Sequence, residues 1–149
     1  MYCEDANYIH LEPMASRKSA DFVSAYKAGI TFFTNHDLPP SFDRLDNETS
    51  QALERYCSDN RIALQYVPPH NHRANKAERV MRTFKNHFIA MLSSTEASFL
   101  MQTWDLLLPQ AELTLNLLRP CHMNASQSAW EFVRGKYDFD RNPIAPFGT

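Results

Sequence analysis

Apolar and polar positions alternate in short segments of the chain, a pattern that predicts β-strands. Residues 61–67 alternate most regularly, with isoleucine, leucine and tyrosine on one side of the predicted strand. Residues 6–12 and 41–46 are further β-compatible runs, and the second of them ends at an aspartate. Pro13 directly follows residues 6–12, and Pro68 directly follows residues 61–67. Since proline cannot continue a sheet ladder, it ends both strands.

Apolar positions at steps of three and four residues predict helices between and after these strands. The first helix begins at Ser16 or Ser19, either of which can cap it, and ends near the turn at 35–40. A longer helix follows residue 76, and a third follows residue 103. The apolar faces of these three helices are, in order, Phe22, Tyr26, Gly29, Ile30 and Phe33; Ala77, Met81, Phe84, Phe88 and Met91; and Trp104, Leu107, Leu108, Ala111, Leu115 and Leu118.

Two shorter helices complete the pattern, at 50–59 and at 126–135, and Gly135 ends the second of them. Pro109 is expected to interrupt the third long helix near its start. The order of elements is strand, helix, strand, helix, strand, long helix and further helices. This order predicts an α/β fold in which helices cover a sheet.

Composition favours a globular protein. The chain has 149 residues, of which 44% are apolar and 12% aromatic, as expected for one domain with one core. No apolar run approaches the roughly 20 residues that span a bilayer, and the first ten residues do not resemble a signal peptide. We therefore expect an intracellular protein with no membrane partner. Cys3, Cys57 and Cys121 are odd in number and far apart, which favours buried thiols over disulfides or a zinc finger.

Basic side chains are concentrated in residues 70–88, although the formal net charge of the whole chain is −2. This segment contains five Lys and Arg residues, three His residues and a single acid, Glu78. Two interpretations stay open: a phosphate-binding surface, or a solvated charged face, which is the commoner reason for such a run. His70 and His72 have no third ligand nearby in the sequence, which favours a polar loop over a zinc site.

Asp46 ends a predicted strand, and Glu78 begins the helix that follows the next strand. Both acids can therefore converge at one edge of an α/β sheet. Converging carboxylates repel each other, and Mg²⁺ or Mn²⁺ is the ion that such oxygen ligands suit. Arg82 and Lys85 lie at i+4 and i+7 from Glu78, where they would hold a nucleic-acid backbone next to the metal. The alternative is a simple Glu78–Arg82 pair at a helix N-terminus, which the spacing alone favours.

The segments "RLDNETSQALERYC" and "IALQYVPPHNHRANKAERVMRTFK" resemble the second half of the catalytic core of retroviral and retrotransposon integrases. The shared features are an Asp-Asn pair after a strand, a helix, a strand, a Pro-rich loop with Asn, and a Glu-Arg pair that opens a long helix. Upstream "NYIHLEPMASRKSADFVSAY" and downstream "NLLRP" and "SAWEFVRGKYDF" are similar to neighbouring parts of that core. The resemblance covers nearly the whole chain.

The resemblance implies an RNase H-like fold, here with an incomplete mixed sheet flanked by helices. It also implies a polynucleotidyl transferase that trims and joins DNA ends in the nucleus, using Mg²⁺ or Mn²⁺. Asp46 and Glu78 would be the second and third catalytic acids and would both bind the metal. The residues expected to contact nucleic acid are Asn47, His72, Arg73, Asn75, Lys76, Arg79, Arg82 and Lys85.

The chain departs from the family pattern in three ways. Glu48 replaces the usual glycine after Asp-Asn, which removes a permissive backbone position. The 31 residues between Asp46 and Glu78 are fewer than the family usually has. The first catalytic aspartate belongs on a strand before residues 6–12, and we expect this chain to lack it. Asp5 is not expected to substitute, because the residues after it run directly into the next strand and leave no room for a hairpin.

Two hypotheses follow. In the first, residues 1–149 are a single partial integrase core, with an RNase H-like part at 1–120 and a C-terminal helix and Pro-rich tail at 121–149. In the second, the chain is a non-catalytic nucleic-acid-binding remnant of a transposable element. DNA is the expected partner in both, and a homodimer would cover a sheet edge that a missing strand leaves open. Loss of one metal ligand is expected to weaken metal binding and remove most catalysis.

Overall fold

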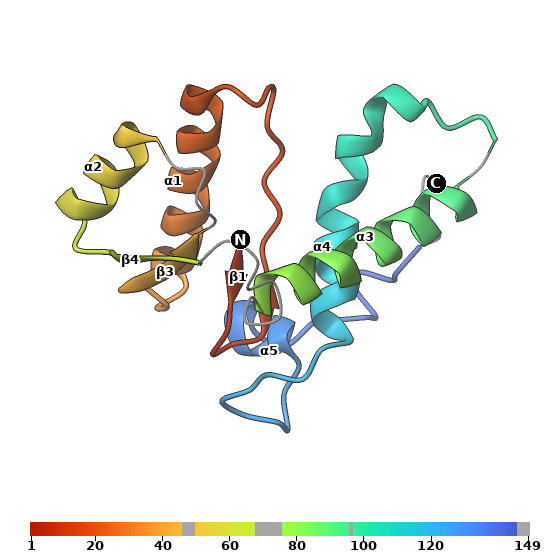
Figure 1. Ribbon diagram of the computed structural model, residues 1–149. Coiled ribbons are helices and arrows are strands. Elements are labelled where there is room, and N and C mark those ends of the chain that lie inside the picture. The colour runs from red at the N-terminus through yellow and green to blue at the C-terminus, as the bar shows by residue number, and fades with distance from the viewer. Residues whose placement is uncertain (46–49, 68–75, 96, 146–149) are drawn as a thin grey trace. The chain divides into compact units, whose positions relative to one another are not determined.

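The computed structural model describes residues 1–45, 50–67, 76–95 and 97–145. The chain forms two compact units, one of residues 1–11 with 79–149 and one of residues 12–78. Figure 1 shows the helices and strands of both units. A search of the described residues finds no helix that is long and apolar enough to cross a bilayer.

The unit of residues 12–78 contains two helices and a pair of parallel strands (Figure 1). Along the chain these are α1 (Ser19–Asn35), β3 (Phe42–Leu45), α2 (Gln51–Asp59) and β4 (Ala63–Tyr66). The strands pair from Phe42 opposite Ala63 to Leu45 opposite Tyr66. The core of this unit is formed by Val23, Tyr26, Ile30, Leu53, Cys57 and Ile62, with Leu45 and Leu64 of the strands packed against it.

α1 begins where the sequence predicts, but neither candidate serine caps it. The N-cap residue is Lys18, whose backbone is extended and whose side chain makes no capping hydrogen bond. Ser16 lies farther upstream, where its Oγ accepts a hydrogen bond from the Lys18 N–H at 3.2 Å and donates to the Asp21 carboxylate. The predicted capping role of Ser16 or Ser19 is therefore wrong, because Ser16 ties an acid of the first turn to the preceding loop instead.

β4 is shorter than the segment of alternating residues that predicts it. Ile62 is buried and Leu64 half-buried, as expected, but Tyr66 is exposed. The Tyr66 hydroxyl donates to a Glu54 carboxylate oxygen at 2.7 Å on the surface of the unit. A tyrosine counts as an apolar position in an alternating segment, but its hydroxyl group allows the side chain to lie on the surface instead of in the core.

Asp43 of β3 lies in a partly buried position next to α1. The Tyr26 hydroxyl donates to its Oδ2 at 2.8 Å, and burial raises the pKa of the Asp43 carboxyl. A carboxyl whose pKa is raised by folding contributes stability below its ordinary pKa, and that contribution is lost as pH rises through the folded-state value. Burial of Asp43 therefore makes the folded unit less stable at neutral pH than it is at low pH.

We expect Asp43→Asn to raise the free energy of unfolding at neutral pH by less than about 1 kcal/mol, because Asn can still accept the Tyr26 bond. The difference from wild type should disappear below the ordinary carboxyl pKa. Urea unfolding at several pH values measures both effects. The exposed Asp59→Asn is the charge-matched control, and an identical pH profile for the two variants would contradict the assignment.

The unit of residues 1–11 and 79–149 begins with a hairpin and continues with helices (Figure 1). Its elements are β1 (Tyr2–Cys3), β2 (Tyr8–Ile9), the part of α3 (Lys76–Ser94) from residue 79 onward, the 3-10 helix η2 (Met101–Leu107), α4 (Leu108–Leu117) and α5 (Ala129–Arg134). Pro109 lies in the first turn of α4 and helps to begin it. The helix predicted from residue 104 onward is therefore divided just before Pro109, as expected, into the 3-10 helix η2 and the α-helix α4.

β1 and β2 form a short hairpin that the sequence did not predict; it lies around Asp5 and not after it. The strands are antiparallel, with Cys3 opposite Tyr8. A tight turn joins them, in which the Asn7 N–H donates to the Glu4 carbonyl at 3.2 Å and Asn7 adopts φ 54°. Asparagine tolerates this left-handed conformation, which lets the chain reverse direction in a short turn. Asp5 is exposed in the turn.

The predicted apolar faces are correct in their centres and wrong at some edges. Most of the α1 and α4 positions are buried, whereas α3 buries Met91 and leaves Phe84 and Phe88 half-buried. The residues that the spacing assigns to the core but that are exposed in the structure are Phe22, Met81, Trp104 and Leu118. Helical spacing identifies a stripe, but the width of the stripe that is covered depends on neighbours far away in the sequence.

The described residues form a mixed α/β structure with two separate two-stranded sheets, one antiparallel and one parallel. The predicted α/β class is confirmed at this level. A single domain over residues 1–149 stays a prediction. Cys57 and Cys121 are buried free thiols, as predicted, while Cys3 is partly exposed.

Candidate nucleic-acid interface

α3 presents three of the predicted basic residues on its exposed surface. Arg79, Arg82 and Lys85 follow one another at three-residue steps, and all are exposed. Residues at such steps are neighbours on a helix. None of the three side chains forms a hydrogen bond or an ion pair with a residue that the structure describes. These cations are therefore available to bind phosphate oxygens.

Glu78 lies in the first turn of α3 and is half-buried, and Lys76 at the start of the helix is exposed. The other predicted site residues lie outside the described residues: Asp46, Asn47, His72, Arg73 and Asn75. Whether Asp46 and Glu78 converge therefore stays a prediction. Within the described ranges, no group of three His, Cys, Asp or Glu side chains is placed to hold a metal ion. A magnesium or manganese site with Glu78 as a ligand also stays a prediction.

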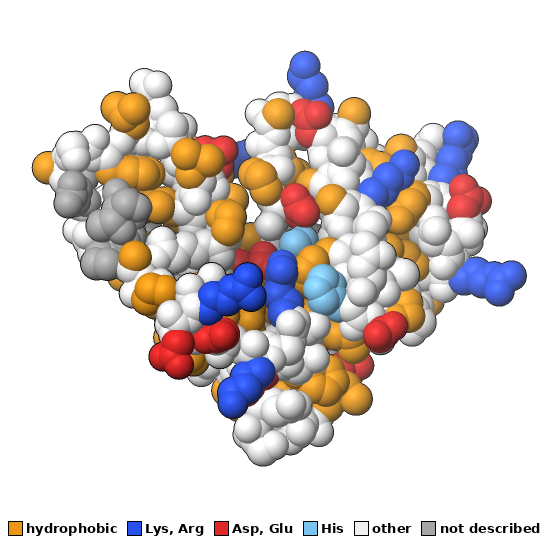
Figure 2. Space-filling view, turned by 180° about the vertical axis from the view of Figure 1, so that it is seen from behind, with side chains coloured by type: hydrophobic (Ala, Val, Ile, Leu, Met, Phe, Trp, Pro, Cys, Tyr) orange, Lys and Arg blue, Asp and Glu red, His pale blue; other side chains and the backbone are white. Residues whose placement is uncertain are grey.

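The surface around the bases of α3 is partly apolar. Met81 and Ile89 lie four residues before and four residues after Lys85, and both side chains are exposed. Figure 2 shows one face of the molecule, on which Lys and Arg side chains form small separate groups, several of them close to Asp or Glu.

The opposite side of α3 is fixed by aromatic and aliphatic packing. The rings of Phe84 and Phe88 stack with centroids 5.5 Å apart, and Met91 packs with residues of η2 and α4. His87 Nε2 lies 2.8 Å from Thr114 Oγ1, and burial lowers the pKa of His87, so the ring is neutral at neutral pH. These contacts determine which face of α3 is left exposed.

A buried polar cluster, which the sequence analysis did not identify, surrounds Glu112 of α4. This carboxylate is 5% exposed. Tyr8 Oη donates to its Oε1 at 2.7 Å, the Leu11 N–H donates to Oε2 at 2.8 Å, and His10 Nδ1 lies 3.2 Å from Oε2. Arg134 of α5 adds Nη2 at 3.3 Å from Oε1. The cluster therefore joins β2, α4 and α5.

The pKa of Glu112 reflects two opposing influences. Burial is the larger single influence and raises the pKa, but the hydrogen bonds from His10, the Leu11 N–H and Tyr8 together hold it below its ordinary value. The carboxylate is therefore ionised in the folded protein at neutral pH. Every buried side-chain nitrogen and oxygen among the described residues has a hydrogen-bond partner. A buried polar cluster whose hydrogen bonds are all satisfied makes the surrounding structure rigid.

The same helix binds the hairpin at two further points. Asn116 is completely buried, and its amide accepts from the Ile9 N–H at 2.9 Å and donates to the Ile9 carbonyl at 2.8 Å. Just beyond α4, Arg119 Nε donates to the Asn7 carbonyl at 3.0 Å, and Asn7 Nδ2 donates to the Pro120 carbonyl at 2.8 Å. The short hairpin is thus held by side chains more than 100 residues away.

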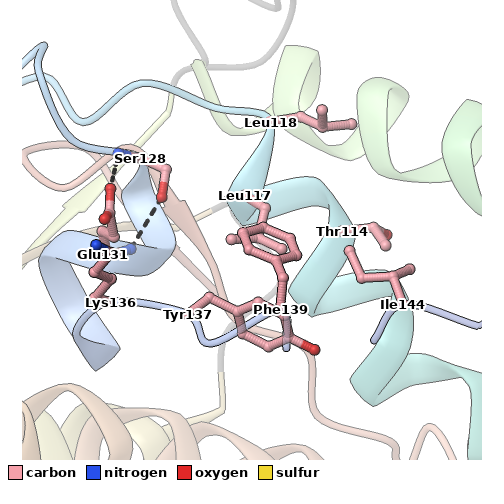
Figure 3. A pocket seen from close by; sticks show the side chains of 9 residues that line it. All are labelled: Thr114, Leu117, Leu118, Ser128, Glu131, Lys136, Tyr137, Phe139 and Ile144. Carbon is pink, nitrogen blue, oxygen red and sulfur yellow. Dashed lines mark hydrogen bonds between the residues drawn. The ribbon is translucent and has the colours of Figure 1, made fainter. Parts of the chain in front are cut away.

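A shallow, largely apolar pocket of about 490 Å³ lies between α4, α5 and the segment after α5 (Figure 3). Leu117, Phe139 and Ile144 form much of its lining. The rings of Tyr137 and Phe139 meet edge to face with centroids 4.8 Å apart, and the Gln110 side chain donates to the Ala145 carbonyl at 2.8 Å. The lining contains none of the residues predicted to bind metal or nucleic acid.

Comparisons with known proteins give a fold and no family. No protein-family model matches the chain, and no curated protein matches it. A structural match is found to a chain in the cryo-EM structure of the simian T-cell lymphotropic virus intasome in complex with PP2A regulatory subunit B56 gamma. The TM-score is 0.60 and the sequence identity 17%, and the match covers 90% of this chain but 44% of that chain. The backbone of this protein is therefore similar to one part of a chain in a viral intasome complex, and that part is less than half of the chain.

Proposed function

We propose that this protein binds DNA through α3 as part of an integrase catalytic core with an RNase H-like fold. The observation that carries the proposal is the exposed series of Arg79, Arg82 and Lys85, whose side chains have no partner among the described residues. Phosphate contacts from such side chains supply most of the affinity of proteins for DNA. The proposed interface would also include Lys76 and the polar residues before α3.

Two independent lines support the family part of the proposal. The order of motifs around Asp46 and Glu78 resembles the second half of an integrase core. The fold is similar to that of a chain in a viral intasome complex over 90% of this protein. In the proposed site Asp46 and Glu78 would hold Mg²⁺ or Mn²⁺, which would activate an attacking oxygen at a phosphorus atom. The nucleus is the compartment in which such an activity would act.

Substitution of both bases, Arg82→Ala with Lys85→Ala, is expected to weaken binding to a short DNA duplex by about tenfold at low salt. The slope of log K against log salt should fall by about 2, since each lost phosphate contact removes about 0.9. Fluorescence anisotropy at several salt concentrations measures both quantities. The variant should unfold like wild type, because both side chains are exposed.

The matched control is Arg17→Ala with Lys18→Ala, which removes one Arg and one Lys from exposed positions just before α1. This control should change the affinity less than twofold. Equal losses in the two double variants would show that DNA responds to net charge alone and would contradict an interface on α3.

Metal-dependent strand transfer distinguishes the proposed enzyme from the alternative, a non-catalytic nucleic-acid-binding remnant. Joining of a labelled DNA end to a target duplex, dependent on Mg²⁺ or Mn²⁺ and lost in Asp46→Asn and in Glu78→Gln, supports the enzyme. DNA binding that is unchanged in both variants, without any joined product, supports the remnant. The two carboxamide variants keep side-chain size and remove only the charge that a metal requires.

A further inference from the structure

The hydrogen bonds between β3 and β4 determine which backbone groups of β3 point away from its partner. The Ala63 N–H donates to the Ser41 carbonyl at 2.9 Å, and the Val67 N–H donates to the Leu45 carbonyl at 3.0 Å. In a parallel pair, a residue that bonds across the sheet does so with the residues just before and just after the one opposite it. The backbone groups of residues 41, 43 and 45 therefore point toward β4. The N–H and carbonyl groups of Phe42 and Arg44 therefore form the outer edge of β3.

Three of these four outer groups have no hydrogen bond within the part of the chain that the structure describes. Neither Phe42 nor the Arg44 carbonyl has a backbone hydrogen bond to any part of the chain that the structure describes. The Arg44 N–H is accepted by Asp43 Oδ1 at 2.8 Å, within the same strand. The Phe42 side chain is 51% exposed, and the Arg44 guanidinium lies 5.9 Å from the centre of its ring. The edge thus offers free backbone groups beside one apolar and one positive side chain.

A parallel pair of four-residue strands is a small sheet. Parallel sheets are normally larger and covered on both faces, and isolated two-stranded sheets are marginally stable. An open edge of this kind is a template for another strand. We propose that the outer edge of β3 binds one extended strand of another polypeptide, with an apolar side chain opposite Phe42 and a carboxylate opposite Arg44. This inference rests on the unit of residues 12–78 alone and does not depend on the proposed function.

A second copy of β3 fits this edge poorly. In a symmetric antiparallel pair the outward residues must pair with each other, which allows three registers. One register places Asp43 opposite Asp43, and another places Arg44 opposite Arg44, so like charges meet in both. The third places Arg44 opposite Pro40, which has no N–H to donate. The charge pattern therefore favours a different strand, one that carries an acid.

The probe is a blocked peptide, acetyl-Thr-Val-Val-Val-Glu-Val-Val-Val-Thr-amide, which has Val two positions away from Glu on both sides and so fits the edge in either strand direction. It is added to the full chain labelled with ¹⁵N. At saturation we expect hydrogen exchange of the Phe42 amide to slow by at least tenfold, with smaller effects on amides that already face β4. The variant Phe42→Pro should lose binding, because it removes an outward N–H and leaves the β3–β4 bonds intact. Arg44→Glu should lose binding of this peptide and bind a version with Lys in place of Glu.

A peptide N-methylated at alternate residues tests the edge without altering the protein, and it should not bind. Unchanged Phe42 exchange at millimolar peptide, or equal binding of the methylated peptide, would overturn the proposal. Protection of the Phe42 amide that grows with protein concentration in the absence of peptide would also overturn it, in favour of a second copy. The DNA affinity of the α3 surface is measured separately, so its outcome does not affect this test.

Discussion

Replacement of Glu112 by alanine is expected to lower the free energy of unfolding by about 3–5 kcal/mol, as is typical when one partner of a buried ionic cluster is removed. The carboxylate accepts hydrogen bonds from Tyr8 and from the Leu11 N–H and pairs with His10 and Arg134. Without it these donors remain at a buried position with no acceptor, and β2, α4 and α5 lose their common contact. Urea unfolding monitored by circular dichroism measures the loss.

Two variants make this result specific. Glu112→Gln keeps the size and one acceptor oxygen, so it should lose less stability than Glu112→Ala. Asp105→Ala removes an exposed acid just before α4 and should change the free energy of unfolding by no more than about 0.5 kcal/mol. If Glu112→Ala and Asp105→Ala were equally stable, the hydrogen-bonded cluster would contribute nothing to the fold.

The same cluster gives a pH dependence with a defined sign. Because folding lowers the pKa of Glu112, its contribution to stability is complete above the ordinary carboxyl pKa and is lost as pH falls through the lower folded-state value. The difference in stability between wild type and Glu112→Gln should therefore shrink as the solution is acidified. Asp43 has the opposite behaviour, since its pKa is raised.

Local signals in the sequence mark the ends of two short helices, and one of these signals, Gly135, predicts a helix end. Ser128 caps α5 and forms a reciprocal capping box with Glu131, and Gly135 ends the helix with φ 86°, which glycine adopts without strain. Ser50 caps α2 in the same way, by accepting a hydrogen bond from the Leu53 N–H. These signals involve residues three or four apart, so they can be recognised without knowledge of the tertiary structure.

The basic surface on α3 was predictable for the same reason, since three-residue spacing places Arg79, Arg82 and Lys85 together on any helix. The buried cluster was not. Glu112 and Asn116 occur at four-residue spacing within an otherwise apolar helix face, which in retrospect marks a buried polar contact. Their partners in the hairpin, however, lie more than 100 residues away. The sequence of the hairpin contains no polar pattern that matches this spacing, so those partners cannot be identified from neighbouring residues.

The hairpin itself was missed because each strand is two residues long and needs a partner outside it. Its outer strand, β2, has no further strand beside it in the sheet among the described residues. Asn116 takes that place, since its side-chain amide forms both of the hydrogen bonds that a neighbouring backbone would form with Ile9. The stability of β1 and β2 therefore depends on a residue of α4.

Asn116→Ala is accordingly expected to cost about 2–6 kcal/mol, because it leaves both the N–H and the carbonyl of Ile9 buried and unsatisfied, at about 1–3 kcal/mol for each group. The loss should be local first: hydrogen exchange of the Ile9 amide should accelerate more than that of amides in α1 or α2. The exposed Asn86→Ala on α3 is the control and should leave both quantities near wild type. Unchanged Ile9 exchange in Asn116→Ala would mean that the hairpin is held by β1 and Arg119 alone, and that the amide of Asn116 does not act as its missing neighbour.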